Sequence, residues 1–381
     1  MKISILTGPW LPVPTVRGGG AQKIWHGLAL EMSRQGHDVT LVARSFPGQA
    51  PAEVIEGVRY LRSRGFSQGR FVGFDLAKDL VYALNVVPRL PVADILVTND
   101  FWVPLLAARF RRTAGAVVVS AGRFPKGQYR LYRRAARIVA NSRAVREAIV
   151  AEQPVLDART VLIPNPVPLE LFEPRTARRD SGRRKLFYAG RIHPEKGIEL
   201  LLRAFTRLSP HFPDWHLELV GPTRADEGGG GELFVGPLRE SSRGLRVDWR
   251  EPIWDPVALA AAYVSADAFC YPSLAERGES FGLAPLESMA AGVPPVVSDL
   301  ACFRDFVRDG ENGWIFDHRG AGAEERLAEV LARAMTDEPA VERMRAAARR
   351  EAEGFGYVHV AQQYLAEFER ILAEVPSKAQ R

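Results

Sequence analysis

Cysteine and the common metal-binding patterns are almost missing from this chain. Its 381 residues include only Cys270 and Cys302, and no CxxC pair occurs. Two isolated cysteines favour a reduced, intracellular protein that needs no disulfide. No His, Cys and Asp residues have the spacing of a zinc site, and neither a nucleophile elbow nor a Walker loop is present. We therefore expect no metal ion and no cofactor, and we interpret His216 as a structural residue of a strand.

Long hydrophobic runs are absent as well. No stretch has the roughly eighteen uncharged apolar residues that a transmembrane helix needs. The first residues, MKISILTGPWLP, hold one lysine and a short apolar run, without the long apolar region and cleavage site of a signal peptide. We expect a first β-strand there and a cytoplasmic protein.

Length and charge indicate two domains. The chain of 381 residues exceeds one ordinary core and suits two domains of about 150–200 residues each. Hydrophobic residues make up 46% and charged residues 25%, which is typical of a folded protein. The net charge of +6 is uneven, because residues 1–180 carry 26 basic and 14 acidic side chains and the remainder carries 25 and 31. A basic first half and an acidic second half indicate domains with different partners.

Short apolar runs alternate with helical stretches in both halves of the chain. The first half predicts a helix at 21–35 and strands at 3–7, 39–43, 95–98, 116–120 and 138–140. The second half predicts a helix at 197–208 and strands at 186–189, 217–220, 268–271 and 295–297. Strands that alternate with helices form parallel sheets covered on both faces, so we expect an α/β protein with two doubly wound sheets.

The domain boundaries follow from composition. Residues 175–185 are polar and basic without an apolar run, which predicts a linker between domains at 1–174 and 186–357. An amphipathic stretch at 358–372 predicts a final helix within 358–381. Two such sheets in tandem leave a central cleft, and their ligands bind at the carboxyl ends of the strands.

The sharpest chemical signal is ESFGLAPLE, in which Glu279 and Glu287 lie before and inside an expected helix. We expect Ser280 to cap this helix, and the N–H groups around Phe281 and Leu283 to face a phosphate or a sugar hydroxyl. Gly282 allows a ligand to approach the backbone closely. The alternative, a surface helix with two solvated glutamates, stays open.

A second signal lies between a strand and a helix, in GRIHPEKG from Gly190 to Gly197. Arg191 and Lys196 follow the carboxyl end of the strand and precede a helix N-terminus, a position that favours a diphosphate. Two fixed cations there stabilise the charge that grows on a leaving phosphate. A strand-helix loop with two exposed cations is the alternative.

Two glycine runs complete the pattern. Gly18, Gly19 and Gly20 lie between the first strand and the first helix, where backbone can approach a ligand. This run is not GxGxxG, so a nicotinamide site is disfavoured. The run at 228–231 is interpreted as a mobile surface loop, because no helix is predicted directly after it.

Together these motifs resemble the family-four retaining glycosyltransferases of the GT-B fold. Five stretches carry the likeness, in the order of the family and across almost the whole chain: Gly18–Gly20 with Gly36-His37-Asp38-Val39, Ala140–Ser142, Ile163–Val167 with Phe172, Gly190–Gly197, and Glu279–Glu287 with Gly292–Pro294. The combination of Glu279, Glu287 and the Gly190–Gly197 element is quite specific.

The resemblance implies a function and a set of roles. The second domain would hold a UDP- or GDP-sugar, with Arg191 and Lys196 on the diphosphate, Glu279 on the transferred sugar and Glu287 on the ribose. Further donor contacts would come from Gly19, Gly20, Gly190, Ser280, Phe281, Gly282 and Leu283. Transfer would retain the configuration at the sugar, and the C-terminal helix would cross back onto the first domain. A glycan, a lipid-linked sugar or a small molecule would accept the sugar.

The chain departs from the family at one catalytic position. Relatives often carry a histidine after the fourth strand of the first domain, where this sequence has Asn99 and Asp100. We expect Asp100 to face the sugar as a hydroxyl acceptor rather than as a neutral donor. Asn99, Trp102 and Arg123 are the candidates for the acceptor side.

A basic stretch in the first half of the chain has two possible interpretations. Residues 101–146 contain eleven Lys and Arg and no acid. The stretch from 109 to 146 predicts peripheral contact with an anionic membrane at the inner face of the cytoplasmic membrane. A solvated basic helix is the alternative, whereas nucleic acid is disfavoured because no recognised module is present.

Two other functions stay open on the sequence alone. One is a nucleotide-sugar epimerase or hydrolase of the same fold, which would form product without an acceptor. The other is a non-catalytic protein that binds a nucleotide sugar. The presence of Arg191 and Lys196 together with Glu279 and Glu287 argues against the second, because simple binding does not need the charge-stabilising pair.

Overall fold

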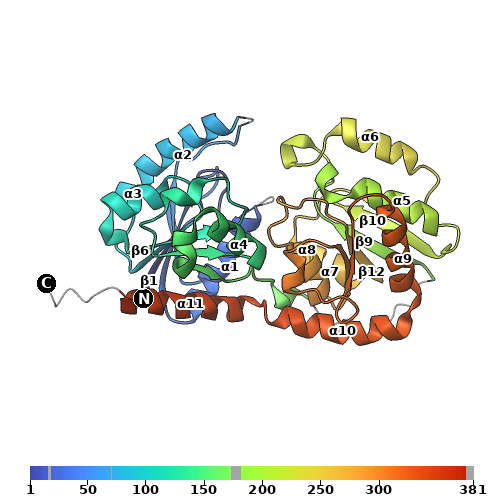
Figure 1. Ribbon diagram of the computed structural model, residues 1–381. Coiled ribbons are helices and arrows are strands. Elements are labelled where there is room, and N and C mark those ends of the chain that lie inside the picture. The colour runs from blue at the N-terminus through green and yellow to red at the C-terminus, as the bar shows by residue number, and fades with distance from the viewer. Residues whose placement is uncertain (16–18, 70, 173–181, 375–381) are drawn as a thin grey trace. The chain divides into compact units, whose positions relative to one another are not determined.

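The computed structural model describes residues 1–15, 19–69, 71–172 and 182–374. The chain divides into two compact units, one formed by Met1–Pro166 with Tyr357–Arg381 and the other by Val167–Gly356. Each unit is a sheet covered by helices, as the ribbon in Figure 1 shows. No helix in the described ranges combines the length and the apolarity that crossing a bilayer requires.

The first unit is built on an eight-stranded sheet in the order β3-β4-β2-β1-β5-β6-β7-β8. Its strands are β1 (Lys2–Leu6), β2 (Asp38–Arg44), β3 (Ala52–Ile55), β4 (Val58–Ser63), β5 (Ile95–Thr98), β6 (Ala116–Ala121), β7 (Arg137–Ala140) and β8 (Thr160–Leu162). All neighbours pair in parallel except the β3–β4 hairpin. The strand order reverses between β1 and β5, which makes the carboxyl ends of these two strands a topological switch point.

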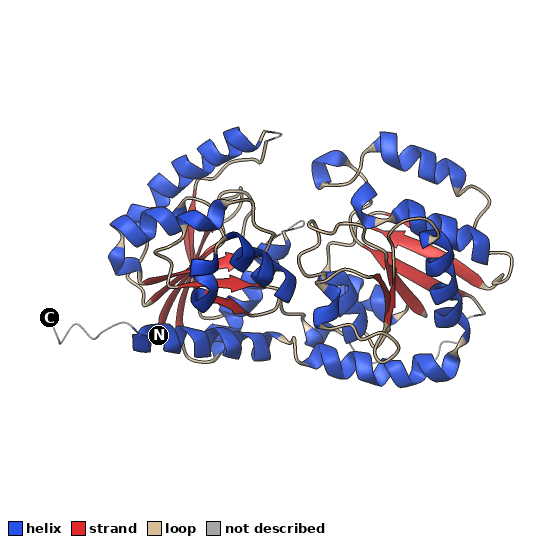
Figure 2. Cartoon of the chain, viewed as in Figure 1, coloured by secondary structure: helices blue, strands red, loops and turns tan. Residues whose placement is uncertain are grey.

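Helices cover both faces of the first sheet, as Figure 2 shows. They are α1 (Gly20–Arg34), α2 (Val72–Val86), α3 (Val103–Phe110), α4 (Arg143–Glu152) and α11 (Tyr357–Glu374). Alternate residues of the strands enter two separate apolar cores, so that Ile5 joins the core with α1 and α11 while Leu6 joins the core with α2, α3 and α4.

The C-terminal helix α11 belongs to the first unit. Tyr364 packs edge-to-face on Trp25 of α1 with ring centroids 5.1 Å apart. The ring of Tyr357 lies so close to Gly27 that a Cβ atom there would be 2.3 Å from the tyrosine Cε1. In β7 the buried Arg137 donates from Nε to Oε1 of Glu367 at 2.5 Å. These contacts attach the last helix to the sheet that begins the chain.

The second unit has a six-stranded, wholly parallel sheet in the order β11-β10-β9-β12-β13-β14. Its strands are β9 (Arg184–Ala189), β10 (Trp215–Val220), β11 (Val247–Arg250), β12 (Ala268–Tyr271), β13 (Pro295–Ser298) and β14 (Trp314–Phe316). Its helices are α5 (Ile198–Leu208), α6 (Glu232–Ser241), α7 (Pro256–Val264), α8 (Leu283–Ala290), α9 (Ala323–Thr336) and α10 (Glu338–Glu353).

The boundary between the units differs from the expected one. Val167 and Phe172, assigned from sequence to the first domain, are buried in the core of the second unit. Most of the expected linker at 175–185 lies outside the described residues, and its last two residues, Arg184 and Lys185, already belong to β9. Apolar residues that precede and follow the polar stretch, such as Phe172 and Leu186, therefore pack in the same core of the second unit.

Candidate active site

The segment that follows β9 is held in place by glycine geometry. Gly190 carries the chain out of the strand, and Gly197 is the N-cap of α5, with a positive φ of 69°. A Cβ atom on Gly197 would be 2.0 Å from the carbonyl oxygen of Pro272, which follows β12. Only glycine permits this approach, so the residue joins two strand ends that neighbour each other in the sheet.

Backbone hydrogen bonds extend the same junction. The carbonyl oxygen of Glu195 accepts from the N–H of Leu274 at 2.8 Å and from Oγ of Ser273 at 3.4 Å. The segment after β12 is thereby fixed against the segment after β9, and it carries Glu279 toward Lys196. The two motifs that the sequence places 83 residues apart thus meet at one edge of the sheet.

Lys196 and Glu279 form a buried ion pair at this junction. Nζ of Lys196 lies 2.6 Å from Oε2 of Glu279, and the two side chains are 6% and 11% exposed. The lysine also lies 5.5 Å from the ring centre of Tyr271, which stacks on Tyr188 with planes 8° apart. Burial, and after it the negative charge of Glu279, raise the pKa of both tyrosines well above its usual value. The pair therefore lies in a poorly hydrated environment, where charges act strongly on a ligand.

Helix α8 begins beside Glu279, but Ser280 does not cap it as expected. The N-cap is Gly282, with a φ of 90°, and no side chain caps the helix. A Cβ atom on Gly282 would be 2.3 Å from Cε1 of Phe303, which explains the glycine. The first N–H groups of α8 have no acceptor inside the helix. Glu287 lies within α8, and its charge, after burial, raises the pKa of Tyr263.

Arg191 is held from two sides. Its Nη2 lies 2.5 Å from Oε1 of Glu195, and its Nη1 donates to the carbonyl oxygen of Gly228 at 3.0 Å. The side chain is 44% exposed, so a ligand can reach it. Arg191 and Lys196 are thus both brought to the carboxyl end of β9.

The prediction that no helix follows the glycine run at 228–231 is wrong. Helix α6 begins directly after it at Glu232, contrary to the expectation that no helix follows. The N–H of Gly230 donates to the carbonyl oxygen of Ile192 at 2.7 Å, so the run packs on the Arg191 segment. Pro237 lies inside α6, and a proline there disfavours the prediction of a helix. The run belongs with the candidate site. Its contact with the Arg191 segment depends on tertiary packing, and no sequence motif predicts it.

The first unit brings other candidates to its switch point. Gly19 is the N-cap of α1 with a φ of 78° and Gly20 is its first residue, while Gly18 lies outside the described residues. Nε2 of Gln22 donates to the carbonyl oxygen of Thr7 at the end of β1. The α1 start is thereby fixed beside the strand that ends there.

Asp100 follows β5 and is almost wholly buried, at 8% exposed. Its carboxyl group lies over Gly8, where a Cβ atom would be 2.2 Å from Oδ1. Burial, and after it the charge of Asp79, raise the pKa of Asp100 well above its ordinary value. A raised pKa favours the protonated form, in which the carboxyl group can donate a hydrogen bond, whereas the sequence alone predicts a hydroxyl acceptor.

The acceptor-side candidates follow the carboxyl ends of β5 and β6, which are neighbours in the first sheet. Asn99 and Arg123 are exposed. Trp102 is half-buried, and its Nε1 donates to the carbonyl oxygen of Leu76 at 2.9 Å, which ties the start of α3 to α2. Trp102 thus has a packing role in this structure. Asp79, which the sequence did not single out, lies on α2 and accepts from the N–H groups of Phe101 and Trp102 at 3.2 and 3.4 Å.

The basic stretch does not form the single helix that the alternative interpretation assumed, although most of its cations are exposed to solvent. It runs through α3, β6, β7 and the start of α4. Arg137 is buried and pairs with Glu367 and Glu374, and Arg146 pairs with Asp157 at 2.5 Å. The exposed cations of the stretch are Arg109, Arg112, Arg123, Lys126, Arg130, Arg133, Arg134 and Arg143.

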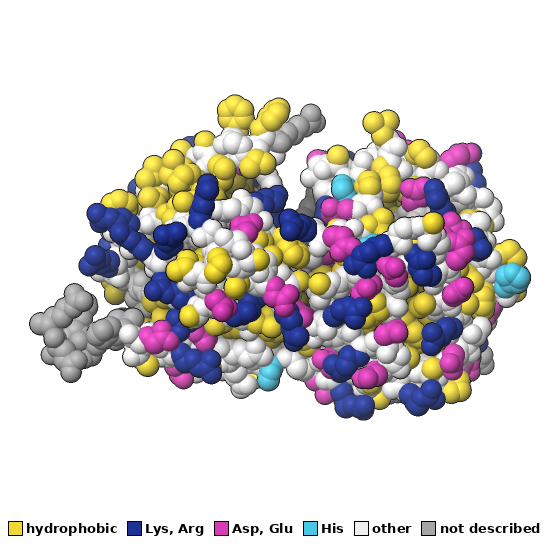
Figure 3. All heavy atoms as spheres, in the orientation of Figure 1, with side chains coloured by type: hydrophobic (Ala, Val, Ile, Leu, Met, Phe, Trp, Pro, Cys, Tyr) yellow, Lys and Arg dark blue, Asp and Glu magenta, His cyan; other side chains and the backbone are white. Residues whose placement is uncertain are grey.

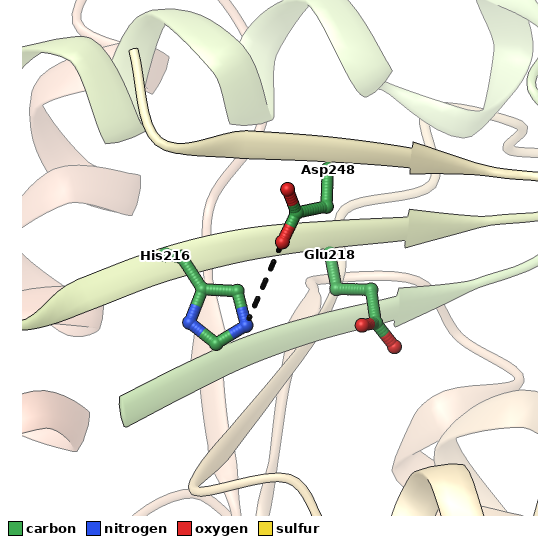
Figure 4. A group of neighbouring side chains, drawn as sticks. All are labelled: His216, Glu218 and Asp248. Carbon is green, nitrogen blue, oxygen red and sulfur yellow. Dashed lines mark ion pairs between the residues drawn. The ribbon is translucent and has the colours of Figure 1, made fainter. Parts of the chain in front are cut away.

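One side-chain cluster has the composition of a metal site. His216 and Glu218 on β10 and Asp248 on β11 place ligand atoms within 4.8 Å of one another. Figure 4 shows the His216 ring facing the Asp248 carboxylate, with 3.9 Å between Nε2 and Oδ2. The carboxylates are already paired, Glu218 with Lys185 at 3.3 Å and Arg250 at 3.2 Å, and Asp248 with Arg183 at 3.2 Å. We interpret the cluster as a salt-bridge network across the strands and assign no metal to it.

Comparisons with known proteins identify the family of the chain. A model of the glycosyl transferases group 1 family matches residues 172–351, and a model of glycosyltransferase family 4 matches residues 18–171. The D-inositol 3-phosphate glycosyltransferase of Kribbella flavida is 32% identical over 64% of this chain and 58% of its own length. The phosphatidyl-myo-inositol mannosyltransferase of Mycobacterium leprae is 34% identical over 50% of this chain and 47% of its own length. The matches thus span about half of these relatives.

Solved structures support the fold. The sucrose-phosphate synthase of Thermosynechococcus elongatus superposes with a TM-score of 0.78 over 98% of this chain and 99% of its own, at 21% identity. HepE of Anabaena in complex with UDP-glucose gives a TM-score of 0.73 over 97% of this chain and 100% of its own, at 18% identity. These likenesses confirm the predicted GT-B fold with two Rossmann-like sheets.

Proposed function

Because the chain belongs to the group 1 glycosyltransferases of family 4, we propose that it transfers a sugar from a UDP- or GDP-sugar to a glycan, lipid-linked or small-molecule acceptor, with retention of configuration. The single observation that carries this proposal is the buried Lys196–Glu279 pair, 2.6 Å long, beside the exposed guanidinium of Arg191. A diphosphate binds to cations and sugar hydroxyls bind to a carboxylate, so a nucleotide sugar needs both kinds of group side by side.

The cations act on the leaving group. When the bond between the sugar and the phosphate breaks, negative charge grows on the diphosphate. Lys196 and Arg191 are fixed at the carboxyl end of β9 and meet that charge without a rearrangement of solvent. The N-terminus of α8 adds unpaired N–H groups and the positive end of the helix dipole. No metal ion is needed in this scheme.

The carboxylates act on the hydroxyl groups of the donor. Glu279 is oriented by Lys196, and its carboxylate is the acceptor for a hydroxyl of the transferred sugar. Glu287, on α8, binds the ribose. In the retaining step the acceptor oxygen bonds to the anomeric carbon on the face that the phosphate leaves, and the acceptor proton passes to a phosphate oxygen.

The relatives support the choice of donor and acceptor. HepE was solved with UDP-glucose, and the mycobacterial relative is named for transfer of mannose to phosphatidyl-myo-inositol. A nucleotide diphosphate hexose as donor and a membrane-borne acceptor are consistent with both. We infer that the protein works in the cytoplasm and reaches such an acceptor at the inner face of the membrane.

A mixed apolar and basic surface on the first unit supports that location. It consists of exposed residues on and beside α2 and α3, with exposed fractions between 57% and 75%: Phe71, Val72, Phe74, Val81, Leu84 and Phe110. Figure 3 shows hydrophobic side chains gathered over α2, with Lys and Arg over the neighbouring α3. Arg109 stacks on Phe110 at 5.1 Å. Apolar side chains that insert beside cations that attract lipid phosphates are typical of interfacial helices.

Nucleotide release and product analysis test the proposal. The purified protein is supplied with UDP- and GDP-hexoses, with and without lipid-linked and glycan acceptors, and mass spectrometry follows sugar transfer. Lys196→Ala and Glu279→Ala should each abolish most turnover. Sugar release or epimerisation without an acceptor would instead identify a hydrolase or an epimerase, and tight donor binding without any turnover would identify a binding protein.

A further inference from the structure

Four buried polar atoms at the switch point of the first sheet lack a hydrogen-bond partner among the described residues. They are Oγ1 of Thr7, Oδ1 of Asp79, the hydroxyl of Tyr82 and Oδ2 of Asp100. A buried polar atom of this kind destabilises the folded protein if nothing binds it. Their concentration in one place, after β1 and β5 and under α2, therefore indicates a site that a polar ligand completes.

The two carboxyl groups of this cluster are linked through the backbone. Asp79 is 4% exposed and its Oδ2 accepts from the N–H groups of Phe101 and Trp102, which directly follow Asp100. Asp100 is 8% exposed, and its Oδ1 lies over Gly8. The charge of Asp79 raises the pKa of Asp100, so the two buried carboxyl groups interact, and ionising both at neutral pH carries a large electrostatic cost.

We propose that Asp79 and Asp100 share one proton, and that the Asp100 carboxyl group uses it to hydrogen-bond a hydroxyl-bearing ligand at the switch point between β1 and β5. This inference rests on the proposed function for the identity of that ligand, which is then the sugar substrate. Asp100 contacts the ligand, and Asp79 is a positioning residue that holds the proton on Asp100 and fixes the segment that carries it.

The electrostatic surroundings favour the acid form. Burial raises the pKa of Asp100 well above its ordinary value, the charge of Asp79 raises it further, and the pKa of Asp79 itself is raised to about 6. The other titratable groups that face the pair are Tyr82 on α2 and Tyr132, whose pKa values are themselves raised by burial and by these carboxylates. The facing residues from β1, β5 and α1 are the neutral Thr7, Thr98 and Gln22.

A neutral carboxyl donor and an ionised acceptor respond differently to an amide. Asp100→Asn keeps a donor of similar shape, whereas Asp100→Leu removes both functions. If Asp100 donates, the Asn variant should bind the sugar donor within about threefold of wild type, and the Leu variant should raise KM about tenfold. If Asp100→Asn raised KM as much as Asp100→Leu does, Asp100 would act as an anion.

The pH profile isolates the role of Asp79. In the wild type KM should rise at high pH as Asp100 loses its proton. Asp79→Asn removes the like charge, so this limb should move to lower pH, and in Asp100→Asn it should vanish. Asp75→Asn is the matched control: it lies on α2, pairs with Lys78 and should leave the limb unchanged. A limb that stays in place in Asp79→Asn would overturn the shared proton.

A readout without turnover separates this inference from the proposed function. Difference infrared spectroscopy of the full chain should show the carbonyl band of a protonated carboxyl at neutral pH, and Asp100→Asn should remove it. If the band is present and no sugar is transferred, the pair stands and the proposed function fails. Stabilisation of wild type but not of Asp100→Asn by Mg²⁺ or Mn²⁺, with no band, would identify a cation site and overturn the proposal.

Discussion

Nζ of Lys196 and Oε2 of Glu279 lie 2.6 Å apart although 83 residues separate them in the chain. The lysine follows β9 and the glutamate follows β12, and these strands are neighbours in the second sheet. The ion pair is therefore a product of the sheet order, and it is also the part of the candidate site that burial makes most sensitive to substitution.

A double-mutant cycle measures this sensitivity. Lys196→Met leaves the buried Glu279 without its cationic partner, so the free energy of unfolding should fall by about 3–5 kcal/mol. Adding Glu279→Gln removes the orphaned charge and should restore much of that loss, while nucleotide-sugar turnover stays abolished. Urea unfolding and a turnover assay on the same samples separate stability from function.

The control for this cycle is an exposed ion pair on α5. Arg203 and Glu199 pair on the helix surface, with side chains 62% and 54% exposed. Arg203→Met should change the free energy of unfolding by less than about 1 kcal/mol. If the buried pair responded as weakly as this one, Lys196 and Glu279 would not form an ion pair in solution.

Gly197 should be irreplaceable because it joins two strand ends. Gly197→Ala brings a Cβ atom to 2.0 Å from the carbonyl oxygen of Pro272, and its φ of 69° adds the strain of the left-handed region. We expect a loss of donor affinity together with a loss of stability above 2 kcal/mol, since the φ alone costs about 1–2 kcal/mol. Calorimetry with UDP and GDP, and urea unfolding, measure both.

Gly292 offers a matched comparison for Gly197. Its φ is 70°, but a Cβ atom there would point into open space. Gly292→Ala should therefore lose only the stability that the backbone strain costs, and should bind nucleotide as the wild type does. Equal losses in the two variants would mean that the contact with Pro272 has no role.

The sequence predicts the sheets well because strand periodicity is local. All nine expected strands are present, and Glu279 and Glu287 lie before and inside a helix as expected. The N-cap of α8 was misplaced, because Ser280 and Gly282 are both good caps and only the packing of Phe303 on Gly282 decides between them.

Tertiary neighbours account for what the sequence could not show. Asp79 lies in an amphipathic helix without a motif, and its relation to Asp100 depends on how α2 packs at the end of β5. The glycine run at 228–231 belongs with Arg191 only because α6 folds back, and Pro237 concealed that helix. The burial that raises the pKa of Asp100 depends on surrounding elements that are distant in the sequence.

The pKa of Asp79 predicts a pH dependence of stability. Its value of about 6 in the folded state exceeds the value of about 3.9 in an unfolded chain, so the folded protein binds more protons between these limits. The free energy of unfolding therefore falls as pH rises from about 4 through about 6, and the penalty is complete above that range.

Asp79→Asn should remove this penalty. The amide oxygen still accepts from Phe101 and Trp102 but does not ionise, so the variant should be more stable than wild type by up to about 3 kcal/mol at about pH 8. Near pH 4 the two proteins should be equally stable. Urea unfolding across the range measures the difference, and a gap that did not change with pH would contradict the assigned pKa.

Metal removal tests how the leaving diphosphate is stabilised. Because Arg191 and Lys196 are proposed to meet its charge, transfer should continue in excess EDTA at the rate seen without it. Arg191→Ala should lower kcat by about 100-fold or more, since a fixed charge at a developing anion is typically worth that much. Activity that EDTA abolishes and Mg²⁺ or Mn²⁺ restores would show that a metal ion carries this role.

Membrane contact depends on the apolar surface of α2 if the proposed location is right. Phe71 and Phe74 are each 69% exposed, and their rings lie 6.3 Å apart. Burying an aromatic side chain in the interface is worth about 1.5–3 kcal/mol, so Phe71→Ser with Phe74→Ser should weaken binding to anionic vesicles at least tenfold.

Leu233→Ser, at a residue of the second unit that is 97% exposed, should not change vesicle binding. Vesicle flotation measures binding, and added salt should weaken the wild-type interaction because lipid phosphates attract the neighbouring cations. Equal flotation of all three proteins would place the membrane contact elsewhere.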